Sequence, residues 1–324
     1  MSSIKILQGN CLDRLRDLPE KSVNTCVTSP PYFGLRNYGI TDQLGMEETP
    51  DQFTENLVKL FREVRRVLRD DGTVWLNLGD SYCSINGYAR ASPEFQRKGR
   101  NNAPANSRSL SELHKANIKT KDLIGIPWRV AFALQADGWY LRQDIIWHKP
   151  NPMPESVQDR CTKAHEYIFL LSKSPKYYYD NEAIKEDCSE SNIQDFMKRK
   201  TLNNKGKGSG TYEEARPDLA RSRADYMPSD LKRNKRSVWE VTPKPYSGAH
   251  FATYPPELIK PCILAGCPEG GTVLDPFGGS GTTAQVSNNL NRNAILCELN
   301  PEYVEIAKGR LQESLGMFLN MEIL

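Results

Sequence analysis

The sequence contains 324 residues, of which 38% are hydrophobic and 26% are charged. This is enough apolar material for one large or two modest domains, which excludes a disordered chain, a collagen-like chain and a small disulfide scaffold. The net charge is only +3. Any surface for a nucleic acid must therefore come from local clusters of cations.

The first 88 residues alternate between strand and helix patterns. A short apolar run over 23–27 predicts a buried strand that ends at Ser29. Apolar side chains at helical spacing predict a helix over 53–68, and Asp-Gly ends it before a strand over 73–78. This order favours an α/β fold with a mostly parallel sheet.

Two basic stretches interrupt the regular pattern. Residues 89–121 and 185–237 are rich in Lys, Arg, Asn and Ser and poor in large apolar side chains. A helix over 127–136 and strands over 144–148 and 167–171 lie between them. Each basic run alone is compatible with a solvated linker, but long irregular segments of compact enzymes are more often functional.

The last part of the chain again alternates between predicted strands and helices. Residues 272–275 predict a buried strand, 282–290 a helix, 294–297 a second strand that ends at Glu298, and 301–311 a final helix. A helical stretch precedes the first of these strands and contains a Pro-Cys step at Cys262, which we interpret as a core cysteine.

The cysteines and the N-terminus indicate the compartment. The eight cysteines form no Cys-x-x-Cys pair, and the four histidines include no His-x-x-x-His, so we expect free thiols and no metal site. The N-terminus contains no apolar signal core, and no run reaches the ~18 apolar residues of a membrane helix. We therefore expect a cytoplasmic protein without a membrane anchor.

A glycine-rich turn joins strand 272–275 to helix 282–290. It reads Asp-Pro-Phe-Gly-Gly-Ser-Gly-Thr-Thr from Asp275 onward, and such glycines let a ligand approach the backbone at a helix N-terminus. No lysine follows Gly281, which disfavours nucleoside triphosphates. Ala284 stands where a dinucleotide turn prefers glycine, which weakens that class without excluding it. S-adenosylmethionine is the third candidate ligand. Its methionine end needs a close backbone and an acid, and not a phosphate-binding loop.

Glu298 supports a ligand that contains a ribose. It ends the strand that follows the glycine turn, where a carboxylate can accept both ribose hydroxyls. The glycine turn alone could be an ordinary tight turn, and Glu298 alone could be a surface residue. Asp275 and Glu298 end successive predicted strands, however, and this combination favours a binding site.

A proline turn, Ser29-Pro30-Pro31-Tyr32, follows the strand at 23–27 directly. The prolines remove two backbone donors and stiffen the turn, which leaves carbonyls beside a hydroxyl and an aromatic ring. These groups suit a flat ring with an exocyclic amino group, because acceptors hold the amino hydrogens while the tyrosine stacks. Alone, the motif is equally compatible with an ordinary proline turn that precedes a core tyrosine.

Together, the two turns resemble those of the amino-group DNA methyltransferases, which modify cytosine N4 or adenine N6. The proline turn precedes the glycine turn with a basic region between them, and this order is similar to the beta class, a circular permutation of the usual sheet. Gly9-Asn10-Cys11-Leu12, His250 to Pro255, Ile146 to Lys149 and His165-Glu166 resemble further family segments. The family more often has aspartate where Asn10 stands.

The resemblance implies a Rossmann-like S-adenosylmethionine-dependent fold with an inserted basic target-recognition region. We expect 1–184 to form the catalytic part, 185–237 the recognition region and 238–324 the cofactor-binding part. The implied catalytic residues are Ser29, Pro30, Pro31 and Tyr32. The implied cofactor-binding residues are Asn10, Cys11, Phe251, Tyr254, Asp275, Phe277, Gly278, Gly279, Gly281, Thr282 and Glu298. The candidate DNA-binding cations are Lys198, Arg199, Lys200, Lys205, Lys207, Lys232, Arg233, Lys235 and Arg236.

The implied reaction is direct methyl transfer to a base flipped out of duplex DNA. In the resembling family, serine at the first position of the proline turn is commoner in cytosine-N4 enzymes, so we expect that product, with adenine-N6 as the alternative. RNA or protein methylation, or an inactive DNA-binding protein, are remoter alternatives. The implied partners are double-stranded DNA, a second copy of the chain and a cognate restriction endonuclease, in a prokaryotic or phage setting.

Overall fold

The computed structural model describes residues 2–34, 43–83, 117–191, 193–194, 231–243, 254–315 and 320–324. The chain divides into two compact units, one made of Met1–Asp180 with Ser237–Leu324 and the other of Asn181–Arg236. No helix among the described residues is long and apolar enough to cross a membrane.

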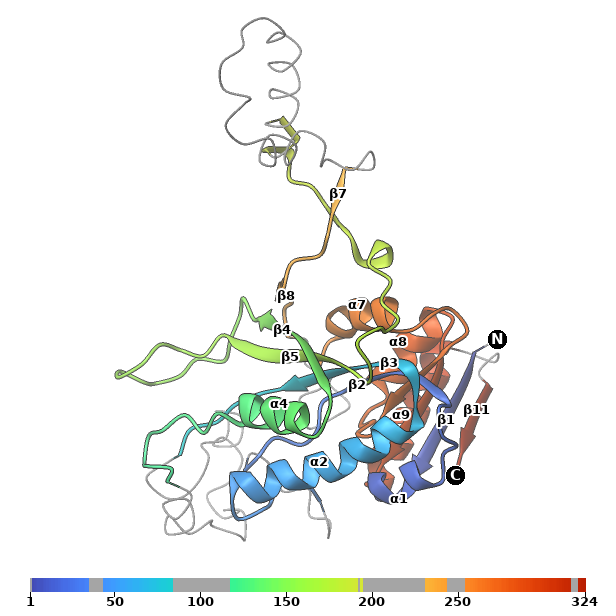
Figure 1. The fold of residues 1–324 in the computed structure, drawn as a ribbon, viewed down its shortest axis with the longest axis horizontal. Coiled ribbons are helices and arrows are strands. Elements are labelled where there is room, and N and C mark those ends of the chain that lie inside the picture. The colour runs from blue at the N-terminus through green and yellow to red at the C-terminus, as the bar shows by residue number, and fades with distance from the viewer. Residues whose placement is uncertain are drawn as a thin grey trace, which may run out of the picture. The chain divides into compact units, whose positions relative to one another are not determined.

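The larger unit is built on one sheet of the described strands (Figure 1). These strands are β1 (Ser3–Gln8), β2 (Val23–Thr28), β3 (Leu68–Leu78), β4 (Tyr140–His148), β5 (His165–Ser172), β8 (Val238–Glu240), β9 (Thr272–Asp275), β10 (Asn293–Glu298) and β11 (Asn320–Ile323). Their order across the sheet is β11-β1-β10-β9-β2-β3-β5-β4-β8. Neighbours are parallel from β11 to β3, β5 is antiparallel to β3 and β4, and β8 is parallel to β4. The predicted α/β fold with a mostly parallel sheet is confirmed.

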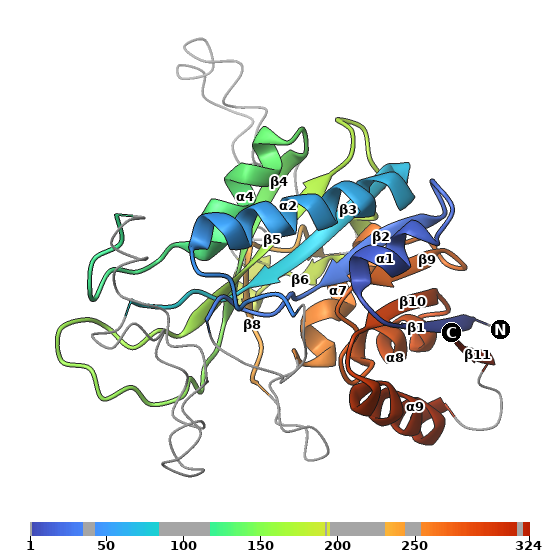
Figure 2. The same cartoon turned by 90° about the horizontal axis from the view of Figure 1, so that it is seen from below.

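Helices cover both faces of this sheet (Figure 2). One face carries α1 (Cys11–Arg16), α2 (Pro50–Val67) and α4 (Ile126–Ala136), and the other carries α7 (Pro256–Gly266), α8 (Thr282–Asn289) and α9 (Pro301–Leu315). Helix α2 begins with a capping box, in which Thr49 and Gln52 satisfy each other's backbone N–H groups.

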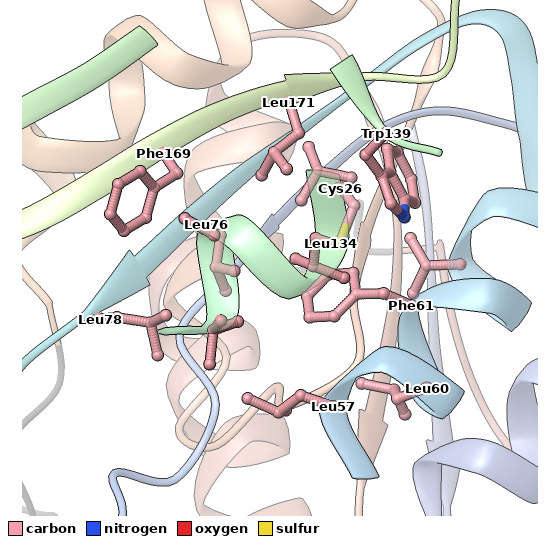
Figure 3. Packing of buried hydrophobic residues seen from close by; sticks show 14 of the residues in the cluster. Cys26, Leu57, Leu60, Phe61, Leu76, Leu78, Leu134, Trp139, Phe169 and Leu171 are labelled. Atoms are coloured by element: carbon pink, nitrogen blue, oxygen red, sulfur yellow. The ribbon is translucent and has the colours of Figure 1, made fainter. Parts of the chain in front are cut away.

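The main core lies between α2, α4 and the middle of the sheet (Figure 3). Phe61 of α2 meets Trp139 edge-on, with ring centroids 6.5 Å apart, and Leu76 and Phe169 close the cluster from neighbouring strands. Each such side chain contributes about 1.5–3 kcal/mol by leaving water. The helical apolar spacing of α2 is therefore what fixes this layer on the sheet.

The topology determines where a ligand site belongs. The chain runs from β9 through α8 to β10 on one side, and from β2 through α2 to β3 on the other. Strands β9 and β2 are neighbours, so the two crossovers diverge at this point. In open α/β sheets, ligands bind outside the carboxyl ends of the strands at such a switch point.

The smaller unit contains a short antiparallel ribbon of β6 (Glu186–Asp187) and β7 (Lys232–Arg233), preceded by the 3-10 turn η2 (Glu182–Ile184). The Glu186 carboxylate lies 3.2 Å from Nζ of Lys235, 3.5 Å from Nε of Arg236 and 3.6 Å from Nε of Arg233. This carboxylate therefore offsets part of the charge of three neighbouring cations.

Several element boundaries differ from the sequence expectation. Strand β3 begins at Leu68, directly after α2, and pairs irregularly with β2 before its regular part from Thr73. Strand β4 begins at Tyr140, four residues earlier than expected. The sequence does not reveal this first half because it is mostly exposed and lacks an apolar run. No strand is predicted from the sequence at β1, β8 or β11. In the structure β1 pairs with β11 on one side and with β10 on the other, and β8 pairs with β4.

Candidate functional site

The proline turn follows β2 directly, as the sequence predicts, and lies at the switch point. Phe33 anchors its far end in the core against Phe53, at 5.6 Å between ring centroids. The Ser29 hydroxyl and the Pro30 carbonyl make no hydrogen bond within the part of the chain that the structure describes. Ser29 is half-buried and Pro30 is buried. These two acceptors are therefore available for a ligand.

The Tyr32 ring is held from two sides. Its hydroxyl donates to a Glu166 carboxylate oxygen at 2.6 Å and lies 3.2 Å from Oδ1 of Asn77. The ring also packs against Gly79, where an added Cβ would come within 2.5 Å of the ring carbon Cε2. Glycine at position 79 is therefore a spatial requirement of the tyrosine.

Glu166 is the centre of a polar cluster across three strands. Lys149, which follows β4, forms an ion pair with one carboxylate oxygen, and Asn77 of β3 donates to the other at 3.2 Å. Burial by itself raises the pKa of Glu166, but the charge of Lys149 and the hydrogen bonds from Lys149, Tyr32 and Asn77 outweigh it and hold the pKa below its ordinary value. The carboxylate is thus charged and held by three partners.

Asp275 occupies the end of β9 and is 1% exposed. One oxygen accepts from the Thr28 hydroxyl at 2.6 Å and from the Phe277 N–H at 3.0 Å. The other accepts from Tyr254 at 2.8 Å and Thr283 at 2.5 Å. Burial raises the pKa of Asp275 above its ordinary value, although these hydrogen bonds oppose the rise.

The Thr28–Asp275 hydrogen bond joins the two turns. Thr28 is the last residue of β2, immediately before Ser29, and its partner lies 247 positions later in the chain. Strands β2 and β9 pair side by side. The structure therefore brings together two motifs that lie far apart in the sequence.

Glu298 ends β10 beside the glycine turn. Its carboxylate accepts from the backbone N–H groups of Gly279 and Asn300, each at 2.8 Å. A carboxylate has about four acceptor positions, so capacity remains for two hydroxyls. Burial raises the pKa of Glu298, and the two backbone hydrogen bonds oppose this. Asn10 caps α1 through Leu12 N–H, and Gly9 donates to the Glu298 carbonyl, which places Asn10 and Cys11 beside this acid.

The glycine turn is shaped for close approach. A Cβ on Gly278 would lie 2.8 Å from that of Leu296, and Gly281 has a φ of +81°. Helix α8 begins at Thr282 without a side-chain cap, so its N-terminal N–H groups suit a carboxylate. Together with Glu298, these groups fit the methionine carboxylate and ribose hydroxyls of S-adenosylmethionine. They fit a nucleotide phosphate less well, because a phosphate-binding loop needs a lysine.

Helix α9 supports the glycine turn from behind. The Arg310 guanidinium donates to the Ser280 carbonyl at 3.3 Å, to its hydroxyl at 3.0 Å, to the Thr282 hydroxyl at 2.8 Å and to Gln285 at 2.8 Å. One side chain thus connects the end of the turn to the first turn of α8.

The predicted DNA-binding cations fall into two groups. Arg233, Lys235 and Arg236 lie in ion-pair range of Glu186, and Arg236 is 69% exposed, while Lys232 belongs to the β6–β7 ribbon. Lys198, Arg199, Lys200, Lys205 and Lys207 lie outside the described residues, as do Phe251 and most of the 89–121 loop. Their roles stay predictions.

Sequence reasoning missed four groups that shape the site: Thr28, Asn77, Gly79 and Arg310. The segments with Lys149 and Glu166 were noted only as family-like, without an assigned role. Arg310 resembles any other helix cation, and Thr28 resembles any strand residue. No local pattern distinguishes such groups, because their partners come from distant segments.

Comparison with known proteins gives consistent relatives. A family model for N6 and N4 methyltransferases, described as DNA methylase, matches residues 23–309. The chain is 47% identical to the type II methyltransferase M.Cfr9I of Citrobacter freundii over 96% of this chain and 89% of that protein. It is 44% identical to the type II methyltransferase M.SmaI of Serratia marcescens over 96% and 91%.

Solved structures share the fold. The PvuII DNA methyltransferase, described as cytosine-N4-specific, superposes with a TM-score of 0.62 at 18% identity, over 96% of this chain and 86% of that chain. The putative DNA modification methylase TTHA0409 of Thermus thermophilus, solved with S-adenosyl-L-methionine, gives 0.58 at 22% identity, over 99% of both chains.

Proposed function

Because the chain belongs to the DNA methylase family of N6 and N4 methyltransferases, we propose that it methylates the exocyclic N4 of cytosine in duplex DNA. It is a type II DNA methyltransferase of this family, and S-adenosylmethionine is its methyl donor. The choice of base, the roles of single residues and the DNA-recognition surface are the parts that we propose.

One observation carries the proposal. The Ser29 hydroxyl and the Pro30 carbonyl have no partner within the described residues, and they precede Tyr32 by three and two residues in the turn at the switch point. An amino group on a flat ring satisfies both acceptors while its ring stacks on the tyrosine. Two hydrogen bonds to the amino hydrogens draw the nitrogen lone pair out of conjugation and direct it toward the methyl donor.

The cofactor side is supported by the residues around the glycine turn. S-adenosylmethionine supplies an electrophilic methyl group when bound. Gly278, Gly279 and Gly281 keep the backbone accessible, the open start of α8 takes the carboxylate, and Glu298 takes the ribose hydroxyls. Asn10 and Cys11 stand beside Glu298, where we place the adenine. Asp275 and Tyr254 brace the turn from inside.

The preference for cytosine depends on Ser29. In the resembling family, serine at this position is commoner in cytosine-N4 enzymes. A hydroxyl and a carboxylate both accept an amino hydrogen, so adenine N6 is the alternative product. No cysteine nucleophile is required, and Cys262 lies buried in α7, which is consistent with transfer to nitrogen and not to carbon 5.

We further propose that 185–237 recognises the target sequence, with 89–121 as a second DNA-facing loop. Their cations would neutralise phosphates, which makes binding strongly salt-dependent. A second copy of the chain and a cognate restriction endonuclease are proposed partners.

The test is incubation with labelled S-adenosylmethionine and mixed-sequence duplex DNA, followed by mass spectrometry of the nucleosides. N4-methylcytosine is expected, and the Ser29→Ala variant should lose at least about tenfold in rate, the loss of one hydrogen bond in the transition state. N6-methyladenine would overturn the choice of base. Label in RNA or protein offered in parallel incubations, with none in DNA, would overturn the proposed substrate.

A further inference from the structure

The hydroxyl of Tyr32 has a task that base stacking does not explain. Stacking uses only the face of the ring, and phenylalanine would supply the same area. Yet this hydroxyl meets Glu166 at 2.6 Å, within the range of a charge-assisted O–H···O⁻ hydrogen bond. The carboxylate is in turn held by Lys149 and Asn77.

We propose that Glu166 is a positioning residue that fixes the plane of the Tyr32 ring before the target base enters. This inference rests on the proposed function, because it gives the ring a base to receive. In this role Glu166 acts through the tyrosine.

The anchor is rigid because its parts come from adjacent strands. Asn77 lies on β3 and Glu166 on β5, where Asn77 is paired with Ile168 in the antiparallel register. Both hydrogens of the Asn77 amide are used, one on Glu166 and one on the Tyr167 carbonyl at 3.1 Å. Side chains held by strands in this way keep tighter geometry than those on loops.

The ring has little freedom within this frame. Its hydroxyl is held by Glu166, and Gly79 packs against the ring beside Cε2. Without the anchor, rotation about the side-chain bonds would carry the ring out of the plane needed for stacking. Reactions that depend on a fixed approach are sensitive to such displacements, even by about 1 Å.

Lys149 keeps the acceptor charged. Its ammonium pairs with the second carboxylate oxygen and lies 4.3 Å from the centroid of the Trp147 ring. A cation packed in this way favours the ionised glutamate. The ionised form accepts only, so the tyrosine must be the donor and the direction of the hydrogen bond is set.

The experiment is a double-mutant cycle of single-turnover methyl transfer at saturating DNA and cofactor. Tyr32→Phe and Glu166→Gln should each lower the rate by roughly tenfold, the loss expected for a charge-assisted hydrogen bond. In the Tyr32→Phe background, Glu166→Gln should change the rate by less than about twofold, since the anchor is already absent. Independent, multiplying losses would overturn the proposal, as would a wild-type rate for either single variant.

Three controls separate positioning from general damage. Cofactor affinity, measured by calorimetry, should be unchanged in both single variants, because the anchor lies away from the glycine turn. Glu240→Gln is the matched control, since it removes an exposed carboxylate that pairs with His148 at 3.3 Å on the same sheet, and it should keep the wild-type rate. Lys149→Arg should also retain most of the rate. Tyr32→Phe alters no charge, so it tests the proposal even if Glu166→Gln fails to fold.

The two proposals fail in different ways. The wild-type product is identified first, and methylation of adenine would change the base while the cycle still tests the anchor. If wild-type protein labels no DNA, the proposed function is overturned. The anchor is then tested by the same cycle in urea unfolding, where zero coupling between positions 32 and 166 would overturn it.

Discussion

At the scale of single residues, the hydrogen bond between Thr28 and Asp275 determines how the two halves of the site meet. It is one of four that a buried carboxylate accepts, and it alone comes from the strand that carries the proline turn. A buried charge that loses a donor has no solvent to replace it. The bond is therefore expected to affect both stability and the approach of the two turns.

Replacing Thr28 with valine keeps the shape and removes this donor. We expect a loss of about 1.5–3 kcal/mol in unfolding free energy, as for a hydrogen bond to a charged group, together with slower methyl transfer. The matched control is Thr25→Val on the same strand, whose hydroxyl meets, among the residues that the structure describes, only the neutral Thr73. It should cost about 0.5–1.5 kcal/mol and leave the rate unchanged. Equal effects on the rate would show that the Thr28 bond is not special to the site.

The pKa of Glu166 predicts a pH dependence of stability. Its pKa lies below the ordinary value of 4.5 in the folded protein, so the unfolded chain binds this proton first as the pH falls. The stabilisation from the charged form is fully present above about pH 4.5 and is lost as the pH drops through the folded pKa. Urea unfolding of wild type and Glu166→Gln should therefore converge below pH 4.5. A constant difference across this window would contradict the prediction.

At the scale of elements, α9 extends the glycine turn beyond its own sequence. Gly281 packs against the helix, where an added Cβ would lie 3.2 Å from that of Ala307, and Arg310 connects the turn to α8. Helix α9 therefore shapes a cofactor site whose proposed ligand groups lie on other elements.

Removing this clamp should weaken cofactor binding. Arg310→Met is expected to raise the dissociation constant for S-adenosylmethionine by about tenfold. The hydrogen bonds that hold the glycine turn in place are lost, and their net free energy is that of one to two ordinary hydrogen bonds. Lys308→Met is the control on the same helix, since Lys308 pairs only with the exposed Glu305 among the described residues, and its affinity should equal that of wild type. Isothermal titration calorimetry measures both, and unchanged affinity in Arg310→Met would remove α9 from the site.

The elements also show which parts of the site the sequence could predict. The turns at Ser29 and Gly278 were predictable because each combines a local strand signal with distinctive residues next to it. The contacts Thr28–Asp275 and Tyr32–Glu166 were not, because they depend on which strands become neighbours and in what register. A one-residue shift in β5 would turn Glu166 to the opposite face. The same reason explains why β11, seen alone, shows no clear strand signal.

At the scale of the whole molecule, the division into two units separates the proposed reaction site from the proposed recognition region. Both turns, the Glu166 anchor and Arg310 belong to the larger unit, while Asn181–Arg236 forms the smaller one. If the smaller unit reads DNA, its cations should affect DNA binding without affecting cofactor binding.

Neutralising five of these cations tests this. Replacing Lys198, Arg199, Lys200, Lys205 and Lys207 with glutamine should reduce the slope of log affinity against log salt by up to about 4.5, since each phosphate contact contributes about 0.9. The affinity for S-adenosylmethionine should not change. Arg62→Gln and Lys308→Gln, on helices that cover opposite faces of the sheet, serve as controls. An unchanged slope would place DNA binding elsewhere.

The pairing of β2 with β9 also has a consequence for how the protein is made. The strand at Val23–Thr28 emerges from the ribosome long before its neighbour at Thr272–Asp275. At about 5–20 residues per second, this wait lasts roughly 12–50 s. During that time one edge of a hydrophobic strand has no partner, which favours misassociation. The nascent chain also cannot complete the site before the glycine turn is synthesised, so a truncated product would be inert and would not modify the genome.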